Sequence, residues 1–285
     1  MATVKDIFEY INTIAPTYMK ESWDNVGLNC GRMDKEVKTI LVALDPFEGV
    51  CQEAAQIGAD LLVTHHALLW NPGFITDETQ QGKNTLFLIE HGIPCLNAHT
   101  NLDCAPGGVN DTLAKVLGLK DVKVVKPVGT DEKGREYGLL RCGTVNEQPL
   151  DTFLAHVKTT LGCEGLRYAD GGKAVHKVCV GGGACGSELT DAYQAGCDTF
   201  VTADVKYNQF WDAKDMGMTI IDAGHFHTEN PVVKVLADKI AAAFPQIRVL
   251  ISKTHSDCMK FFCRGSCGVP FTGGTPAPYP LPLHR

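Results

Sequence analysis

Two adjacent histidines, His65 and His66, follow the apolar run DLLVT. Such a run is typical of a buried β-strand, and open α/β sheets bind ligands at the carboxyl ends of their strands. Neighbouring side chains of a continuing strand face opposite ways, so both imidazoles reach one site only if the chain turns there. The segment Asn71-Pro72-Gly73 favours irregular chain soon afterwards. The pair therefore predicts a metal site, with ordinary polar loop histidines as the alternative.

Further candidate ligands follow two later strand-like runs. Asp103 lies in AHTNLDCAPGGVND, where a simple turn aspartate is the alternative. His225 and Glu229 lie in AGHFHTEN, four residues apart, so they share one face of a helix or converge from a tight turn. Such pairs also occur as capping or surface contacts. With the histidine pair, these residues supply three imidazoles and two carboxylates. That set is enough for two divalent ions and suits zinc, iron, manganese or cobalt better than calcium.

An internal repeat indicates that the fold does not require the two adjacent histidines. The segment from Glu53 to His66, EAAQIGADLLVTHH, aligns without gaps with DAYQAGCDTFVTAD, from Asp191 to Asp204. The second copy has Ala203 and Asp204 in place of the histidine pair. A repeated structural unit thus forms without the pair, which favours chemistry over scaffolding for His65 and His66.

The elements that must position these residues follow from the same repeat. Each copy predicts a strand, a helix, a second strand, a connection and a third strand. We expect an α/β fold of two related units, an internal duplication with helix-covered mixed sheets. The expected parts are a first unit (1–122), a linking subregion (123–173), a second unit (174–262) and a Pro- and Cys-containing tail (263–285). Asn110 is the expected N-cap of one helix, and Pro231 suits the first turn of another.

Composition excludes several classes of protein. The net charge is −7, and the 26 Lys and Arg residues are dispersed, which disfavours bulk nucleic-acid binding. The first residues, MATVKDIFEYINTIAP, lack the apolar core of a secretion signal, and no membrane span is evident. Twelve scattered cysteines then predict reduced thiols and a cytoplasmic protein. Cys258, Cys263 and Cys267 lack the CxxC pairing of structural zinc sites.

Two glycine-rich turns leave alternatives open. VGGGACG, from Val180 to Gly186, contains G-x-G-x-x-G after a predicted strand, and Asp204 ends the next strand. This pattern occurs in dinucleotide sites, but the default is a tight turn with close helix packing. Gly107 and Gly108 precede a helix whose start could hold a phosphate, with a flexible turn as the alternative.

Four segments carry a resemblance to a known family. SWDNVGL, LLVTHH, HTNLD followed by GGVND, and DAGHFHTEN resemble the signature segments of the Nif-three-like dinuclear-metal family. Its members are often labelled GTP cyclohydrolase 1 type 2 homologues. The resemblance runs from about residue 4 to about residue 262, and the tail after Phe262 departs from it. It implies a toroidal homohexamer whose metal sites face an inner cavity. It also implies two divalent ions held by His65, His66, Asp103, His225 and Glu229, with the two carboxylates as bridges.

These expectations combine into a functional hypothesis. We expect a dinuclear metal-binding protein that acts as a metal-dependent hydrolase of the GTP cyclohydrolase 1 type 2 kind. A nucleotide or another phosphorylated small molecule is then the expected substrate. His99, on the connection that carries Asp103, and His255, in KTHSDC, are candidate catalytic residues as proton donors or as partners of a ligand. The alternative is a non-catalytic metal-binding or scaffold hexamer.

Overall fold

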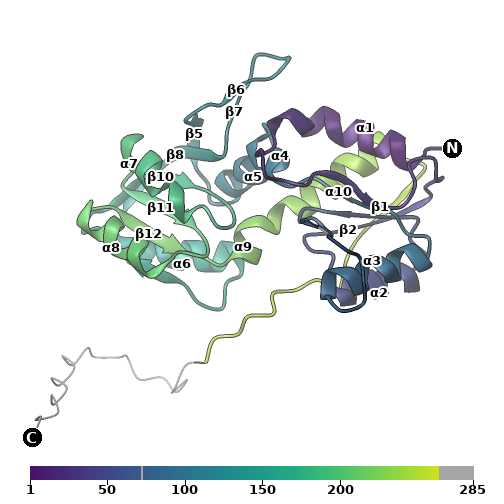
Figure 1. Ribbon diagram of the computed structural model, residues 1–285. Coiled ribbons are helices and arrows are strands. Elements are labelled where there is room, and N and C mark those ends of the chain that lie inside the picture. The colour runs from purple at the N-terminus through teal and green to yellow at the C-terminus, as the bar shows by residue number, and fades with distance from the viewer. Residues whose placement is uncertain (72, 263–285) are drawn as a thin grey trace, which may run out of the picture.

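The computed structural model describes residues 1–71 and 73–262. These residues form two α/β lobes, each with a mixed sheet covered by helices on both faces (Figure 1). The predicted fold class is confirmed. Pro72 and the tail at 263–285, with Cys263 and Cys267, lie outside the described residues. Among the described residues, no helix is long and apolar enough to cross a membrane.

The first sheet has five strands in the order β1-β4-β3-β2-β13. They are β1 (Gly27–Cys30), β4 (Cys95–Asn97), β3 (Leu61–Thr64), β2 (Thr39–Ala43) and β13 (Arg248–Ile251). All neighbours are parallel except β1, which is antiparallel to β4. Every residue of β3 is buried, as the apolar run LLVT predicts for a strand covered on both faces.

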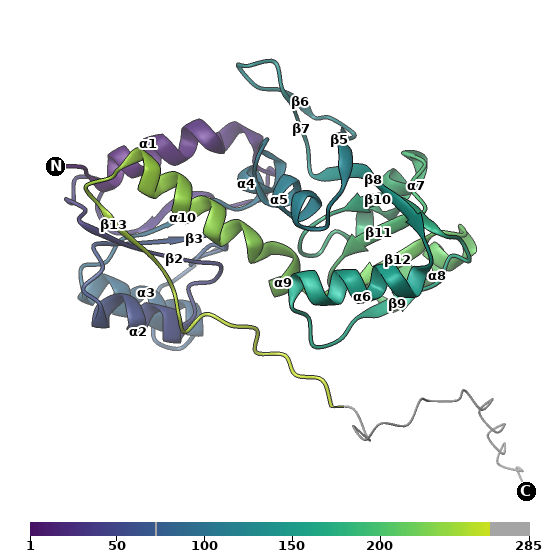
Figure 2. The same cartoon turned by 180° about the vertical axis from the view of Figure 1, so that it is seen from behind.

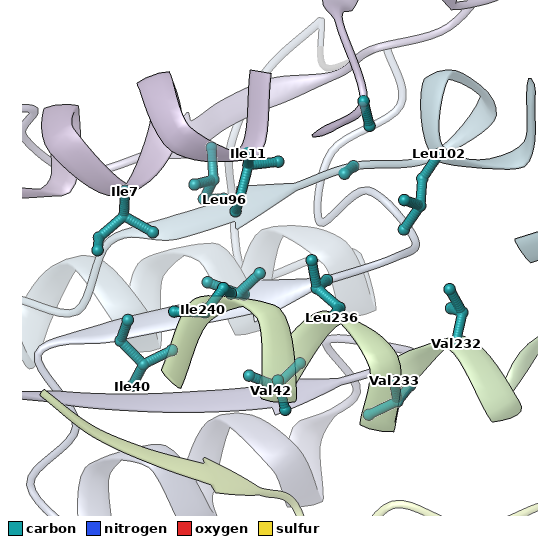
Figure 3. Close-up of a cluster of buried hydrophobic side chains, with 14 of the residues drawn as sticks. Ile7, Ile11, Ile40, Val42, Leu96, Leu102, Val232, Val233, Leu236 and Ile240 are labelled. Carbon is teal, nitrogen blue, oxygen red and sulfur yellow. The ribbon is translucent and has the colours of Figure 1, made fainter. Parts of the chain in front are cut away.

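Helices cover both faces of the first sheet. One face carries α1 (Val4–Ile14) and α10 (Pro231–Ala243), and the other carries α2 (Glu48–Gln56) and α3 (Gln80–Glu90). Figure 3 shows the core on the first of these faces, where Ile7 and Ile11 of α1 meet Leu236 and Ile240 of α10 over the strands. These residues recur at helical spacing, so each helix turns one apolar stripe to the sheet.

The chain returns to the first sheet at its end, which corrects a predicted boundary. The sequence pattern assigns residues 174–262 to the second unit, but β13 pairs in parallel with β2, and α10 packs on the first sheet. That pattern identifies a strand and an amphipathic helix, but it does not specify which sheet completes them. Pro231 begins α10 as predicted.

The second sheet has six strands in the order β5-β8-β10-β11-β12-β9, of which β10, β11 and β12 are parallel. They are β5 (Lys120–Val125), β8 (Leu140–Gln148), β10 (Val175–Val180), β11 (Thr199–Thr202), β12 (Thr219–Asp222) and β9 (Arg167–Ala169). One face packs against α5 (Val109–Val116) and α6 (Leu150–Leu161), and the other against α7 (Leu189–Gln194) and α8 (Tyr207–Asp215). Both sheets thus contain three consecutive parallel strands joined by helices, although the duplication itself stays a prediction.

The predicted linking subregion, 123–173, is mostly part of the second sheet. It supplies β8, β9, α6 and the end of β5. Val145 of β8 and Phe153 of α6 pack in the same core cluster as Val178 of β10. Its polar loop forms a projecting hairpin of β6 (Gly129–Thr130) and β7 (Glu136–Tyr137), visible in Figures 1 and 2.

Two short helices lie where the chain crosses between the lobes, α4 (Thr100–Cys104) and α9 (His225–Glu229). Two further short helices lie within the lobes, η1 (Thr17–Met19) in the first and η2 (Gly186–Glu188) in the second. α9 lies between the two sheets and leads directly into α10 (Figures 1 and 2). Asn110, predicted as an N-cap, instead lies inside α5, whose N-cap is Gly108. Its side chain donates to Leu139 O at 2.6 Å and accepts from Gly182 N at 2.7 Å, which ties two loops of the site together.

Candidate metal centre

The segments that follow all seven parallel strands of the two sheets meet in one place. In chain order they carry Asp45 after β2, His65 and His66 after β3, His99 after β4, Gly183 after β10, Asp204 after β11, His225 after β12 and His255 after β13. Ligand sites form at the carboxyl ends of parallel strands, where polar loops meet helix starts. Here the two sheets share one such site.

The histidine pair turns toward one centre as predicted. His65 and His66 leave β3 at a turn in which Thr64 Oγ1 donates to His66 O at 2.7 Å. Their ring centroids are 4.9 Å apart. Both side chains are therefore directed to the same side of the chain, which an extended strand would prevent.

The other predicted ligands converge on the same point. Glu229 Oε2 lies 2.9 Å from His66 Nε2, 3.1 Å from His225 Nε2 and 3.8 Å from His65 Nε2. Asp103 Oδ1 lies 3.5 Å from His65 Nε2. His225 and Glu229 are i and i+4 on α9, which places them on one face of that helix. The structure brings all five sequence-predicted residues together.

Each imidazole is oriented by an oxygen on its far side. The Nδ1 contacts are His65 with Ala98 O at 2.8 Å, His66 with Asp45 Oδ1 at 2.5 Å, and His225 with Asp204 Oδ2 at 2.7 Å. An oxygen acceptor requires the hydrogen on Nδ1, so each neutral ring presents its Nε2 lone pair to the centre. His66 Nε2 and His225 Nε2 are only 3.3 Å apart. Facing lone pairs repel unless a proton or a cation lies between them.

Orphaned polar atoms test whether the residues fit a metal. Three buried atoms at the centre, His65 Nε2, Asp103 Oδ1 and Glu229 Oε2, have no hydrogen-bond partner. Buried polar atoms are rarely left unpaired, and three acceptors aimed at one point fit a bound cation. Among the described residues, three groups have the spacing of metal ligands: His66, His225 and Glu229; His65, Asp103 and Glu229; and His65, His66 and His99, which has no carboxylate. Glu229 belongs to the first two groups, and its shared oxygen fits a bridging role.

The pKa values of the groups at the centre are strongly shifted. Burial raises the pKa of Asp103 to about 7. Burial opposes ionisation of Glu229 as well, but the close imidazoles of His225, His65 and His66 hold its pKa well below the usual range. Burial also opposes protonation of His66, yet its contacts with Asp45 and Glu229 raise the pKa to about 10. The corresponding contacts with Asp204 and Glu229 raise the pKa of His225 to about 11. The site thus concentrates acceptors that require positive charge.

The turn after β10 requires glycine because the side chains of the centre lie against its backbone. A Cβ on Gly183 would lie 2.2 Å from Glu229 Oε1 and 3.1 Å from His225 Nε2, and the residue has φ +66°. A Cβ on Gly182 would lie 3.2 Å from Glu229 Cγ. The turn therefore lets backbone approach the shared carboxylate closely, in agreement with the tight-turn interpretation. Asp204, which a dinucleotide site would use for ribose, is engaged with His225.

The second glycine pair also forms a turn. Gly107 N donates to Asp111 Oδ2 at 2.5 Å, and Gly107 O accepts from Lys239 Nζ at 2.9 Å. A Cβ on Gly108 would lie 1.8 Å from Leu102 O. Neither glycine lines the cavity beside the candidate metal centre, so the structure favours a turn over phosphate binding.

A cavity of about 530 Å³ opens onto the centre. Of the two candidate catalytic histidines, only His99 lines it. Its ring centroid is 5.1 Å from that of His65. His99 Nδ1 lies 2.9 Å from Asp24 Oδ2. His255 does not line the cavity; its Nε2 instead lies 3.0 Å from Asp45 Oδ2. His255 can therefore reach His66 only through Asp45, whereas His99 faces the cavity directly.

Comparison with known proteins identifies the family. The Duf34/NIF3 family (NGG1p interacting factor 3) matches residues 2–258. The chain belongs to the Duf34/NIF3 family. The resemblance seen in the sequence is thereby confirmed.

Similar proteins cover nearly the whole of this Duf34/NIF3 chain. A Clostridium perfringens relative named GTP cyclohydrolase 1 type 2 homolog is 36% identical over 264 residues, 90% of this chain and 99% of the relative. A Clostridium acetobutylicum relative of the same name is 34% identical, with 90% and 98% covered. Crystal structures of a Bacillus cereus protein related to NIF3 and of a Staphylococcus aureus protein have TM-scores of 0.86 and 0.82 at 24% and 27% identity. Each covers 92% of this chain and 99% of the other.

Three acidic residues of this Duf34/NIF3 site were not predicted as functional. Asp45 and Asp204 orient two of the imidazoles, and Asp24, in SWDNVGL, contacts His99. Burial opposes ionisation of Asp24, yet hydrogen bonds from His99 and Thr100 lower its pKa to about 2. A signal was present in the sequence, because Asp45 and Asp204 each stand within two residues of a strand's end, as the histidines do.

Proposed function

We propose that this Duf34/NIF3 protein binds two divalent metal ions and acts as a metal-dependent hydrolase. The observation that carries the proposal is the convergence of three imidazole Nε2 atoms and two buried carboxylates on one point, with their far sides already engaged. In the proposed arrangement His66, His225 and Glu229 hold one ion, and His65, Asp103 and Glu229 hold the other. Imidazole and carboxylate together favour zinc, iron, manganese or cobalt.

The bound ions would supply Lewis acidity and lower the pKa of a coordinated water toward neutrality. Residues around the centre would hold the ligands in place. Asp45 and Asp204 fix the rings of His66 and His225, so that each Nε2 keeps its direction. Glu229 is buried, and α9 holds it rigidly beneath the glycine turn.

Proton transfer is assigned to His99. Its Nδ1 is held beside Asp24, which leaves Nε2 as the atom that can give or take a proton in the cavity. His255 is assigned a positioning role through Asp45. GTP is the first substrate to test, because the relatives carry the name GTP cyclohydrolase 1 type 2 homolog. The attacked atom would then be the imidazole carbon of the purine.

Metal reconstitution followed by turnover assays tests the proposal. The protein is loaded with zinc, iron, manganese or cobalt, its metal content is measured, and GTP, guanosine and phosphoesters are supplied as substrates. Glu229→Ala is expected to lose both ions and His65→Ala one of them, and both variants are expected to lose hydrolysis. Wild type that holds no metal after reconstitution contradicts the metal assignment. If wild type binds metal but hydrolyses none of the substrates, the non-catalytic metal-binding or scaffold alternative replaces the hydrolase.

We also propose that the protein is a cytoplasmic homohexamer with its metal sites facing an inner cavity. The support is the family match, which covers residues 2–258 and therefore both lobes. The hexamer is what the resemblance to this family implies. Light scattering on purified protein tests it, since a hexamer has six times the 30.8 kDa mass of the chain. A monomeric mass at working concentration would rule it out.

A further inference from the structure

An aromatic wall lines the cavity next to the candidate metal centre. The ring centroids of Trp23 and Trp70 are 6.2 Å apart, and that of Trp70 is 4.9 Å from His99. Trp23 is 60% exposed although its neighbour Asp24 is buried and accepts from Thr100 N at 3.0 Å. A rigidly anchored backbone thus presents a large apolar ring to solvent at the cavity mouth. Such a surface is suited to stacking against a planar ligand.

The polar groups around this wall are mostly neutral or acidic. Gln80, Gln81 and Asn84 line the cavity and offer amide donors and acceptors to the edge of a ring. Among the described residues, no lysine or arginine lines the cavity. Lys20 is the neighbour of one lining residue, but its ammonium donates to the carbonyls of Glu21 and Asp24. The walls therefore lack the cationic side chains that usually recognise polyphosphates.

The proposed metals do not reverse this balance, and at this step the inference rests on the proposed function. Six carboxylates belong to the centre and its cavity: Glu21, Asp24, Asp45, Asp103, Asp204 and Glu229. Two divalent ions offset four of these charges. No positive charge is therefore in excess. A strongly anionic ligand gains little from such a site.

We propose that the cavity binds a planar, uncharged nitrogen heterocycle of the nucleoside kind, stacked on Trp23, and that it does not recognise a triphosphate. The cavity volume of about 530 Å³ is in the usual range for a small-molecule site. The ring edge contacts the amides, and the ring lies beside the metal-binding atoms. This narrows the substrate class of the proposed hydrolase to ligands whose base, and not their phosphate chain, is recognised.

Tryptophan fluorescence tests this directly. The chain has three tryptophans, and Trp211→Phe leaves only Trp23 and Trp70 to report. Metal-loaded protein is titrated with guanosine, adenosine, cytidine and uridine, with each triphosphate, and with inorganic tripolyphosphate. At least one nucleoside is expected to quench saturably and to bind about tenfold or more tightly than its triphosphate at low salt, where repulsion is least screened. Tripolyphosphate is expected not to compete.

Two substitutions locate the binding. Trp23→Ala should weaken nucleoside binding about tenfold, the usual effect of losing one stacking partner, with metal content unchanged. Phe74→Ala is the matched control, because Phe74 is 92% exposed and does not line the cavity. The proposal fails if no nucleoside binds, if a triphosphate binds as tightly as its nucleoside, or if Trp23→Ala leaves affinity unchanged. Metal-loaded protein that binds no nucleoside overturns this inference alone, whereas nucleoside binding by protein that never takes up metal overturns only the proposed function.

Discussion

The strand ends of the two sheets serve the same site in different ways. After β3 the first sheet presents His65 and His66 directly to the centre. After β11, in the aligned position, the second sheet presents Ala203, which is buried, and Asp204, which orients His225 from behind. The direct contribution of the second lobe comes instead from α9. Aligned positions therefore have different roles, since one sheet supplies ligand atoms and the other supplies support.

Backbone geometry explains why the two ends differ. The turn after β10 lies so close to Glu229 that a side chain on Gly183 would overlap the carboxylate. The equivalent turn after β2 carries Asp45, whose side chain reaches His66 at 2.5 Å. At the turn after β10 the backbone itself fills the space beside Glu229, so no side chain fits there. The asymmetry between the lobes thus follows from packing density.

The largest effect is expected from removing the carboxylate that both halves share. Glu229→Ala should abolish binding of both ions, because Glu229 belongs to each of the two ligand groups. His65→Ala removes a ligand from one group only, so about one ion per chain should remain. Elemental analysis after dialysis measures both variants. Glu164→Ala, on the surface beside Lys260, is the control. Equal metal loss in the His65 and Glu229 variants would contradict the division into two groups.

A smaller but still large effect on metal affinity is expected at Gly183, in the turn after β10. Gly183→Ala should lower metal affinity about a hundredfold, because its Cβ displaces Glu229. Gly172→Ala is a matched control: Gly172 also has positive φ, at +75°, but nothing lies within 4 Å of its Cβ position. Both variants should lose about 1 kcal/mol of unfolding free energy from backbone strain. Titration calorimetry and thermal unfolding separate the two effects, and similar metal affinities in both variants would refute the close-approach argument.

Metal binding should release two protons, one from an imidazole of each lobe. The pKa of His66 is raised to about 10 and that of His225 to about 11, so both are protonated in the metal-free protein at about pH 8. Burial raises the pKa of Asp103 only to about 7, so it is ionised there. Metal binding must displace both imidazole protons, and its apparent affinity should therefore rise with pH by up to about a hundredfold per unit. Calorimetry in buffers of different ionisation enthalpy counts the protons; a count near zero would disprove this.

The smallest effects should separate the two supporting carboxylates. Asp45→Asn should weaken metal binding by about a hundredfold and Asp204→Asn by about tenfold, the two ends of the usual range for groups that orient a ligand. The ranking follows from exposure, since the Asp45 side chain is 14% exposed and that of Asp204 is 49% exposed. Competition with a metal-sensitive dye measures both. An equal or reversed ranking would show that burial does not set the strength of this support.

Local sequence patterns predicted the fold class, and together with the family resemblance they predicted the five candidate ligands, although not the carboxylates that orient them. Apolar runs of strand length, the aligned repeat and the polar residues just after each run predicted two α/β units with ligands at the carboxyl ends of their strands. The structure brings all five candidate ligands to one centre: His65, His66, Asp103, His225 and Glu229. Local patterns suffice for this because strand ends and helix faces are set by residues near one another in the chain.

How the two lobes share the site became clear only from the tertiary structure. β13 joins the first sheet, Asp45 is held between His66 and His255, and Gly183 lies against Glu229. Each of these contacts joins residues that are far apart in the chain, and none alters the local pattern of hydrophobic and polar residues. They depend on which apolar surfaces pack together. That choice is made by the whole core and not by any one segment.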